Sequence, residues 1–345
     1  MNLTRRTATV GGLSLLGTTS LRTFARADWG ELNLVEGLED FWLATDAYIY
    51  GYPLVERFQN SNHMGPSECP HFAVTSPKTA TDKNHGIDRL VTMEMTRRVM
   101  TNVATPQATR APMGQLLRAR EYPNASYRDV TAPNADTLYT IAWIDVGTEP
   151  WVLSIPDMKD RYFLFPMLDG WTTVFQVPGK RTTGTGAQTY AITGPGWRGT
   201  LPAGVKEYKS PTNIVWILGR IYCTGRPEDY KAVHEVQDQC KLVPLSAYGK
   251  PYTPPEGKVD PSIDMKTAVR DQVNRLDAKE YFTLLAQLMK TNPPSTADAP
   301  ALNRFAKIGL VAGKDFDASK LNADVVKHIP QFAFDRIMLQ SRDKT

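Results

Sequence analysis

Two aspartates in the middle of the chain have the side chain needed for acid–base chemistry. Asp136 lies in the segment 133–139, just before an apolar run, and Asp169 lies in an Asp-Gly pair between two apolar runs. If the fold brings the carboxylates within about 5–10 Å of each other, one can act as acid while the other acts as base or nucleophile. Each aspartate can instead lock a turn, by accepting hydrogen bonds from nearby backbone N–H groups. The sequence leaves both roles open.

Five further polar residues are candidates for binding a substrate beside these carboxylates. Asn134 and Tyr139 could orient the substrate. Three cations could hold an anionic group of the substrate, and these are Arg161, Lys180 and Arg181. Charge-assisted hydrogen bonds from such cations are among the strong polar contacts that proteins make.

Lys180 and Arg181 belong to a loop, 178–186, that is rich in glycine and hydroxyl residues. The loop is not a P-loop, because Arg181 follows the Gly-Lys pair and Val174 stands where the first glycine would fall. It is not a dinucleotide fingerprint either, because the run after it is predicted to be a strand and provides no helix N-terminus for a phosphate. The sequence therefore assigns no cofactor.

Three of the five histidines fall in a loop-like stretch, 60–85, together with one glutamate and one cysteine: His63, Glu68, Cys69, His71 and His85. Their spacing matches no zinc pattern, and no pair has the i, i+4 spacing of a helical metal site. We therefore predict solvated loop histidines and no metal site. His234 lies in a helical pattern and is predicted to be a structural histidine, and no Gly-x-Ser-x-Gly elbow is present.

In the first 27 residues, charged residues are followed by an apolar run and then by small residues. This order is typical of a secretory signal peptide. Arg5 and Arg6 precede a weakly apolar run, and Ala25-Arg26-Ala27 supplies small residues for cleavage. The paired arginines favour the twin-arginine route. We expect a periplasmic or secreted protein. No later run reaches the roughly 18–20 apolar residues of a membrane span, so no span is expected.

The net charge of +4 does not indicate a nucleic-acid partner. The first 27 residues contribute four arginines and no acidic residue, so the remaining chain carries 36 basic and 36 acidic residues. No dense basic run with interleaved aromatic residues occurs. The expected mature protein therefore lacks the electrostatic footprint that DNA and RNA binding requires.

The elements that would position these residues form a β-rich centre between two helical regions. Helical periodicity predicts helices over 34–60 and 87–103. We divide the chain after residue 27 into three regions: a helical lead-in and loop over 28–130, a β-rich core over 131–222 and a helical C-terminal region over 223–345. Short apolar runs separated by Gly, Pro and Asp predict strands over 137–146, 151–155, 161–168, 171–177, 188–193 and 213–220. This spacing favours an α+β protein with an antiparallel β-sandwich or jelly-roll-like core.

Several segments resemble the exported bacterial proteins grouped as the domain of unknown function 1254 family. The similar segments occur in the same order over about 34–308, and they are 47–54, 133–139, 178–186, 194–197, 210–213 and 248–254. The resemblance implies a jelly-roll β-structure with helical additions and no established activity. It also implies a following jelly-roll domain, numbered 1214, which we expect to be missing because the chain ends at Thr345.

Two functional hypotheses remain. The first is a periplasmic hydrolase or lyase that acts on a polar, carbohydrate-like small molecule, with Asp136 and Asp169 as catalytic groups. The second is a non-catalytic jelly-roll module for ligand binding or assembly, in which the same residues lock turns. We expect a small-molecule ligand for the enzyme and for the ligand-binding module, and a homo-oligomer remains open. The sequence does not decide whether the protein is an enzyme.

Overall fold

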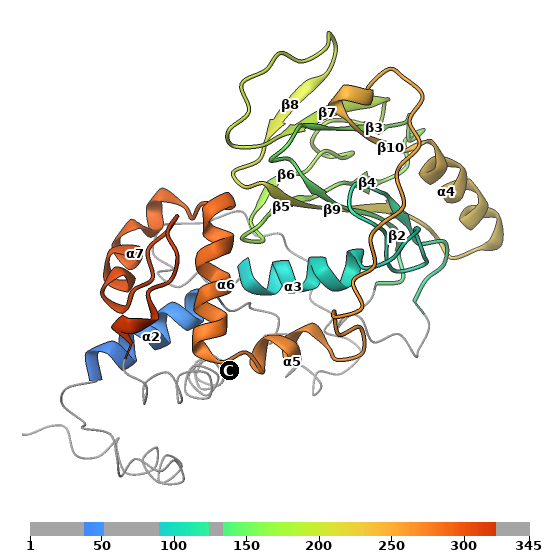
Figure 1. The fold of residues 1–345 in the computed structure, drawn as a ribbon. Helices are drawn as coiled ribbons and strands as arrows, with labels where there is room; N and C mark the ends of the chain where they lie inside the picture. Colours follow the sequence, from blue (N-terminus) through green and yellow to red (C-terminus); the bar gives the residue numbers. More distant parts are fainter. Residues whose placement is uncertain (1–37, 52–89, 124–133, 322–345) are drawn as a thin grey trace, which may run out of the picture.

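The computed structural model describes residues 38–51, 90–123 and 134–321 (Figure 1). It shows an α+β protein in which two sheets form a sandwich-like body beside a group of helices, so the predicted fold class is confirmed. The expected signal peptide and the histidine-containing loop lie outside the described residues.

The larger sheet is built around two long antiparallel strands, β2 (Thr137–Asp145) and β9 (Ile214–Tyr222). They pair without interruption from Thr137 opposite Tyr222 to Asp145 opposite Ile214. The order is β1-β2-β9-β5-β6, with β4 also paired to β9. The short strands of this sheet are β1 (Leu117–Arg118), β4 (Phe163–Leu164), β5 (Met167–Asp169) and β6 (Val174–Gln176).

The smaller sheet has the order β10-β3-β7-β8. Its strands are β3 (Trp151–Ile155), β7 (Gln188–Thr193), β8 (Lys206–Lys209) and β10 (Lys241–Pro244). The pairs β10–β3 and β3–β7 are antiparallel, whereas β7 and β8 are parallel, so this sheet is mixed. β10 lies beyond residue 222, where the β-rich core was expected to end.

The predicted strand over 161–168 is two short strands, β4 and β5, separated by Phe165 and Pro166. Proline has no N–H group to donate to a ladder, so a strand is interrupted there. An Asp-Gly pair between two apolar runs is typical of a β-hairpin, and Asp169-Gly170 does join the antiparallel pair β5–β6. The left-handed residue of its turn is Thr172, with φ 58°, rather than Gly170.

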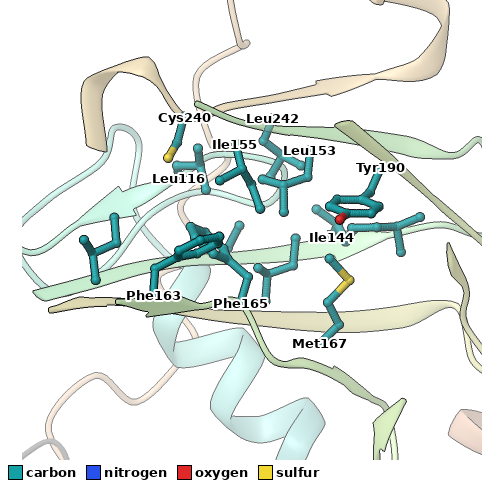
Figure 2. Packing of buried hydrophobic residues seen from close by; sticks show 14 of the residues in the cluster. Leu116, Ile144, Leu153, Ile155, Phe163, Phe165, Met167, Tyr190, Cys240 and Leu242 are labelled. Atoms are coloured by element: carbon teal, nitrogen blue, oxygen red, sulfur yellow. The ribbon is translucent and has the colours of Figure 1, made fainter. Parts of the chain in front are cut away.

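Apolar side chains from both sheets meet between them and form the core of the sandwich (Figure 2). Alternate residues of β2, such as Leu138, Ala142 and Ile144, face this core. Trp143 points to the opposite face, where it packs in a smaller cluster with Met93 and Ile214. Both faces of β2 are thus covered, as is typical of a strand that carries apolar residues on both faces.

The helices form a second body with its own apolar core, which includes Phe41, Tyr281, Phe282, Leu285 and Phe305. The helices of this body are α2 (Leu38–Gly51), α3 (Leu90–Thr101), α5 (Val269–Asn274), α6 (Ala278–Thr291) and α7 (Ala299–Phe305), whereas α4 (Pro227–Gln239) packs on the sandwich. Short 3-10 turns cover Leu245–Ala247, Thr296–Asp298, Ala306–Ile308 and Ala318–Lys320. Figure 1 shows α3 between the larger sheet and the other helices, and α4 apart from them at the sandwich.

Helix α6 begins with a capping box formed by Asp277 and Glu280. The side chain of Asp277 accepts a hydrogen bond from the N–H of Glu280, and Glu280 reaches back to the N–H of Asp277. This reciprocal capping box satisfies two N–H groups that the helix itself leaves unpaired.

None of the helices in the described segments has the length and apolar character needed to cross a bilayer.

Candidate ligand-binding cleft beside α4

A cleft of about 510 Å³ lies between α4, the end of β9 and the segment that precedes β4. The lining residues are Asp157, Met158, Lys159, Asp160, Arg161, Tyr162, Tyr222, Ala232, Glu235, Val236 and Gln239. The four residues from α4 have the i, i+3, i+4, i+7 spacing of one helix face. The opposite face of α4 packs on the sandwich core through the buried Val233.

A tight turn over 158–161 forms one wall of the cleft. The N–H of Arg161 donates to the carbonyl of Met158 at 2.8 Å, and the two central residues have positive φ, 48° at Lys159 and 66° at Asp160. This combination is typical of a type I′ turn, in which glycine, asparagine and aspartate predominate. Asp157 supports the turn by accepting from the N–H of Lys159 at 2.8 Å. The turn thus presents Lys159 and Asp160 to solvent.

Arg161 connects the turn to both β9 and α4. Its guanidinium donates to the carbonyl of Tyr222 at 2.9 Å and to Asp229 Oδ1 at 2.7 Å. Asp229, in the first turn of α4, also accepts from the N–H of Thr224 at 2.6 Å. The Arg161 hydrogen bond is the main cause that lowers the pKa of Asp229 from 3.8 to about 2. Arg161 is therefore engaged in holding α4 against the end of β9.

Removing the Arg161–Asp229 ion pair is expected to change the stability of the fold in a pH-dependent way. Arg161→Met is expected to lower the free energy of unfolding at pH 7 by about 2 kcal/mol, because it removes charge-assisted hydrogen bonds to Asp229 and Tyr222. The pKa of Asp229 is lower in the folded than in the unfolded state. The ion pair therefore stabilises the fold at neutral pH, and its contribution is lost as the pH falls from about 4 through about 2. Urea denaturation at several pH values measures this difference.

The exposed ion pair of Lys290 with Asp315 provides the control. Lys290→Met should cost only about 0.5 kcal/mol, since exposed pairs contribute little. A difference between Arg161→Met and wild type that stays constant from neutral to strongly acidic pH would contradict the assigned role of the Asp229 pair.

The other two candidate cations are placed beside the same turn. Lys180 lies 2.7 Å from Asp160 Oδ1 and also donates to the carbonyl of Asp160. The guanidinium of Arg181 stands over the ring of Tyr162, 5.3 Å from its centroid. Arg161 and Lys180 thus each have a carboxylate partner within the protein, which weakens their case as binders of an anionic substrate.

Asn134, Asp136 and Tyr139 lie at the same end of the larger sheet as the cleft, at the start of β2. Asn134 Oδ1 accepts from the N–H of Thr137 at 3.0 Å and from its hydroxyl at 2.8 Å, and Asn134 Nδ2 donates to the Tyr139 hydroxyl. The carbonyl of Asp136 accepts from the N–H of Cys223, and the Asp136 side chain is exposed. Asn134 has the bonding pattern of a turn-locking residue, and none of the three lines the cleft.

Asp169 lies at the opposite end of the sheet. It pairs with Val215 near the start of β9, whereas Asp136 lies opposite Cys223 just beyond its end. At about 3.3 Å per residue, this separates the two aspartates by roughly 25 Å. Asp169 is buried, and its Oδ1 accepts from the N–H groups of Trp171 and Thr173 at 2.9 and 2.8 Å. The structure does not bring the two carboxylates together for joint acid–base chemistry.

The cleft contains residues that the sequence analysis did not select, chiefly Tyr222, Glu235 and Gln239. Tyr222 is 44% exposed although it ends a central strand, which is unusual for a large aromatic side chain. The apolar residues of α4 recur at helical spacing and identify the buried face of the helix. The only sequence signal for Glu235 and Gln239 is that they are polar residues outside this apolar pattern. An ordinary solvated helix face gives the same signal, so the cleft could not be recognised from it.

Buried polar side chains fix α4 against the sheet. Gln237 is fully buried, and its Nε2 donates to the carbonyls of Ala119 and Tyr139 at 3.2 and 3.0 Å. His234 Nε2 lies 2.6 Å from the carbonyl of Arg120, in agreement with a structural role. Among the described residues, no group of three or more His, Cys, Asp and Glu side chains is arranged to hold a metal ion.

Comparison with protein families gives a match over the β-rich part of the chain. Residues 113–244 match the family described as "Protein of unknown function (DUF1254)". This segment belongs to the DUF1254 family. It contains both sheets and α4, so the cleft beside α4 is formed within the DUF1254 segment. No match was found among curated proteins.

Two solved structures are similar to the chain. The VPA0106 protein from Vibrio parahaemolyticus is 23% identical, with a TM-score of 0.51, over 87% of this chain and 58% of that one. This similarity shows a shared fold, and the chain spans 58% of the length of that relative. An uncharacterized protein from Burkholderia cenocepacia is 12% identical over 37% of this chain and 36% of its own, with a TM-score of 0.23.

Proposed function

We propose that the protein is a non-catalytic module that binds a small, polar, carbohydrate-like molecule in the cleft beside α4. The observation that carries this proposal is the composition of the cleft, in which the exposed ring of Tyr222 and the ring of Tyr162 lie among hydrogen-bonding side chains. An aromatic ring offers an apolar platform for a sugar face, and its hydroxyl adds a polar contact. The volume of about 510 Å³ is in the range of small-molecule sites.

The positions of the two aspartates favour binding over catalysis. A hydrolase or lyase that uses Asp136 and Asp169 together needs them close to one substrate, and they are at opposite ends of β9. The Asp169 carboxylate accepts hydrogen bonds from two backbone N–H groups of its own turn. The turn-locking interpretation of these residues therefore has more support than the catalytic one.

We test the proposal by titrating the full mature chain with neutral sugars, such as glucose and N-acetylglucosamine, at millimolar concentrations and following backbone amide resonances. Saturable shifts are expected at the 158–161 turn and along α4. Tyr222→Ser should weaken binding about tenfold or more, by loss of the aromatic platform. Asp136→Asn is the matched control and should bind as wild type, because Asp136 lies outside the cleft.

Two results would overturn the proposal. One is that no sugar binds, or that Tyr222→Ser binds as tightly as the wild type. The other is that a product accumulates when sugars or their glycosides are incubated with the protein and analysed by chromatography, which would favour an enzyme.

Export to the periplasm is also part of the proposal, and it rests on Arg5, Arg6 and the small residues before position 28. Arg5→Lys together with Arg6→Lys is expected to leave the protein in the cytoplasmic fraction of the cell. Unchanged export of this double variant would refute the twin-arginine route.

A further inference from the structure

We infer that the α4 cleft takes an uncharged sugar chain of at least two units rather than a single sugar. This inference rests on the proposed function, since it specifies the ligand of the same site. The balance of charges at the cleft, the contacts at the C-terminal end of α4 and the pairing of two tyrosines in the wall support it.

The charged side chains at the cleft cancel one another. The ion pairs that Arg161 and Lys180 form with carboxylates each bring together one charge of either sign. A ligand that carries a charge would give up hydration in this cleft without meeting an excess of the opposite charge, which is unfavourable. The remaining charged side chains, among the described residues that line the cleft or pack on its rings, are two carboxylates and two cations: Asp157, Glu235, Lys159 and Arg181.

The C-terminal end of α4 adds no net attraction for a cation. Carbonyl groups at this end of a helix carry a partial negative charge. The guanidinium of Arg118 donates to the carbonyls of Gln237 and Cys240, at 2.8 and 2.9 Å. A cation of the protein therefore already meets the helix end, which leaves hydrogen bonds and apolar contacts as the interactions available to a ligand.

Tyr162 and Tyr222, which both line the cleft, lie opposite each other at the end of the β4–β9 ladder. The N–H of Tyr222 donates to the carbonyl of Tyr162 at 2.9 Å, which extends the antiparallel pairing by one residue. In the next pair, Phe163 and Ile221 both face the sandwich core. Because side chains alternate along a strand, the two tyrosines project together from the other face, with Cβ atoms about 5 Å apart.

Two neighbouring rings suit a ligand that has more than one sugar face. The ring of Tyr222 belongs to a residue that is 44% exposed, and Tyr162 is half-buried beside the guanidinium of Arg181. A sugar unit is about as long as the spacing between opposite residues, so a unit stacked on Tyr222 places the next unit beside Tyr162. Sites with a volume of about 510 Å³ hold drug-sized molecules, which are larger than one hexose.

We test the inference by comparing glucose with its dimer cellobiose, and N-acetylglucosamine with its dimer chitobiose, by amide-resonance titration of the full mature chain. At least one dimer should bind about tenfold more tightly than its monomer, because it contacts a second ring. A gain of less than about threefold for both dimers would overturn the inference.

Charged sugars test the other half of the inference. Glucosamine and glucuronate should bind no more than about threefold more tightly than glucose, even at low ionic strength, where attraction between exposed charges is strongest. A larger gain for either charged sugar would contradict an uncharged ligand.

Tyr162→Ser is the decisive variant, and Tyr162→Phe and Tyr252→Ser are its controls. Tyr162→Ser should reduce the advantage of the dimer to about twofold or less and leave the binding of the monomer, which stacks on Tyr222, unchanged. Tyr162→Phe retains the ring and should keep the full advantage. So should Tyr252→Ser, because Tyr252 lies in the segment after β10 and outside the cleft. An advantage of the dimer that survives Tyr162→Ser would refute the assigned role of the second ring.

Failure of the inference and failure of the proposed function give different results. Equal binding of monomers and dimers would overturn the chain length and leave the binding function standing. Absence of binding for all of these sugars would overturn the proposed function, and the inference with it.

Discussion

Replacing Trp143 by alanine is expected to lower the free energy of unfolding by about 4 kcal/mol, as large-to-small changes of buried aromatic residues do. Trp143 is only 3% exposed, and its ring is stacked on Trp216 with 5.1 Å between centroids and 7° between planes. Both rings belong to the apolar cluster between α3 and the larger sheet. The variant leaves a cavity in the layer that joins the helices to the sandwich. Chemical denaturation followed by circular dichroism measures the loss.

Trp42→Ala provides the control, because Trp42 is 44% exposed on α2. It removes the same side chain from the surface of the helical body and should cost about 1 kcal/mol. If Trp143→Ala cost no more than Trp42→Ala, α3 would not pack on the outer face of the larger sheet as it does in Figure 1.

Asn292→Ala is expected to lower the free energy of unfolding by about 3 kcal/mol. Asn292 ends α6 and is fully buried. Its Oδ1 accepts from the N–H of Ile214, the first residue of β9, at 3.0 Å, and its Nδ2 donates to the carbonyl of Leu288 at 3.2 Å. The variant leaves the Ile214 N–H buried without this acceptor, and an unsatisfied buried donor costs about 1–3 kcal/mol in addition to the lost packing.

Asn303→Ala, on the exposed surface of α7, is the matched control and should change stability by less than about 0.5 kcal/mol. Hydrogen exchange adds a local measurement, because the amide of Ile214 should lose protection in Asn292→Ala more than the amides in the middle of β9. Unchanged protection at Ile214 would contradict the proposed connection between the helical body and the sheet.

Local sequence patterns were enough to predict most individual elements. The apolar runs of β3 and β7 match the observed strands residue for residue, because strand formation there depends on composition and on the turn residues at each end. The capping box at Asp277 and Glu280 marks the start of α6 for the same local reason. The apolar residues on both faces of β2 are likewise a local pattern, and both of its faces are covered.

Strands with weak local signals could not be predicted in the same way. β8 is formed by Lys206–Lys209, whose polar composition gives no strand pattern, and it exists through parallel pairing with β7. β10 follows directly after α4 and pairs with β3, about ninety residues earlier. Pairing of this kind depends on two distant segments together, so it cannot be predicted from the local sequence of either segment alone.

Local sequence patterns indicate which polar residues stand beside turns and strands, and so which of them could do chemistry. Which of these residues lie close together depends on the tertiary fold. The register of β9 places Asp136 and Asp169 at opposite ends, because the start of β2 pairs with the end of β9, whereas β5 pairs near the start of β9. The docking of α4 brings Glu235 and Gln239 to the turn that carries Arg161. Distances between side chains depend on long-range strand pairing and helix packing, which local periodicity does not contain.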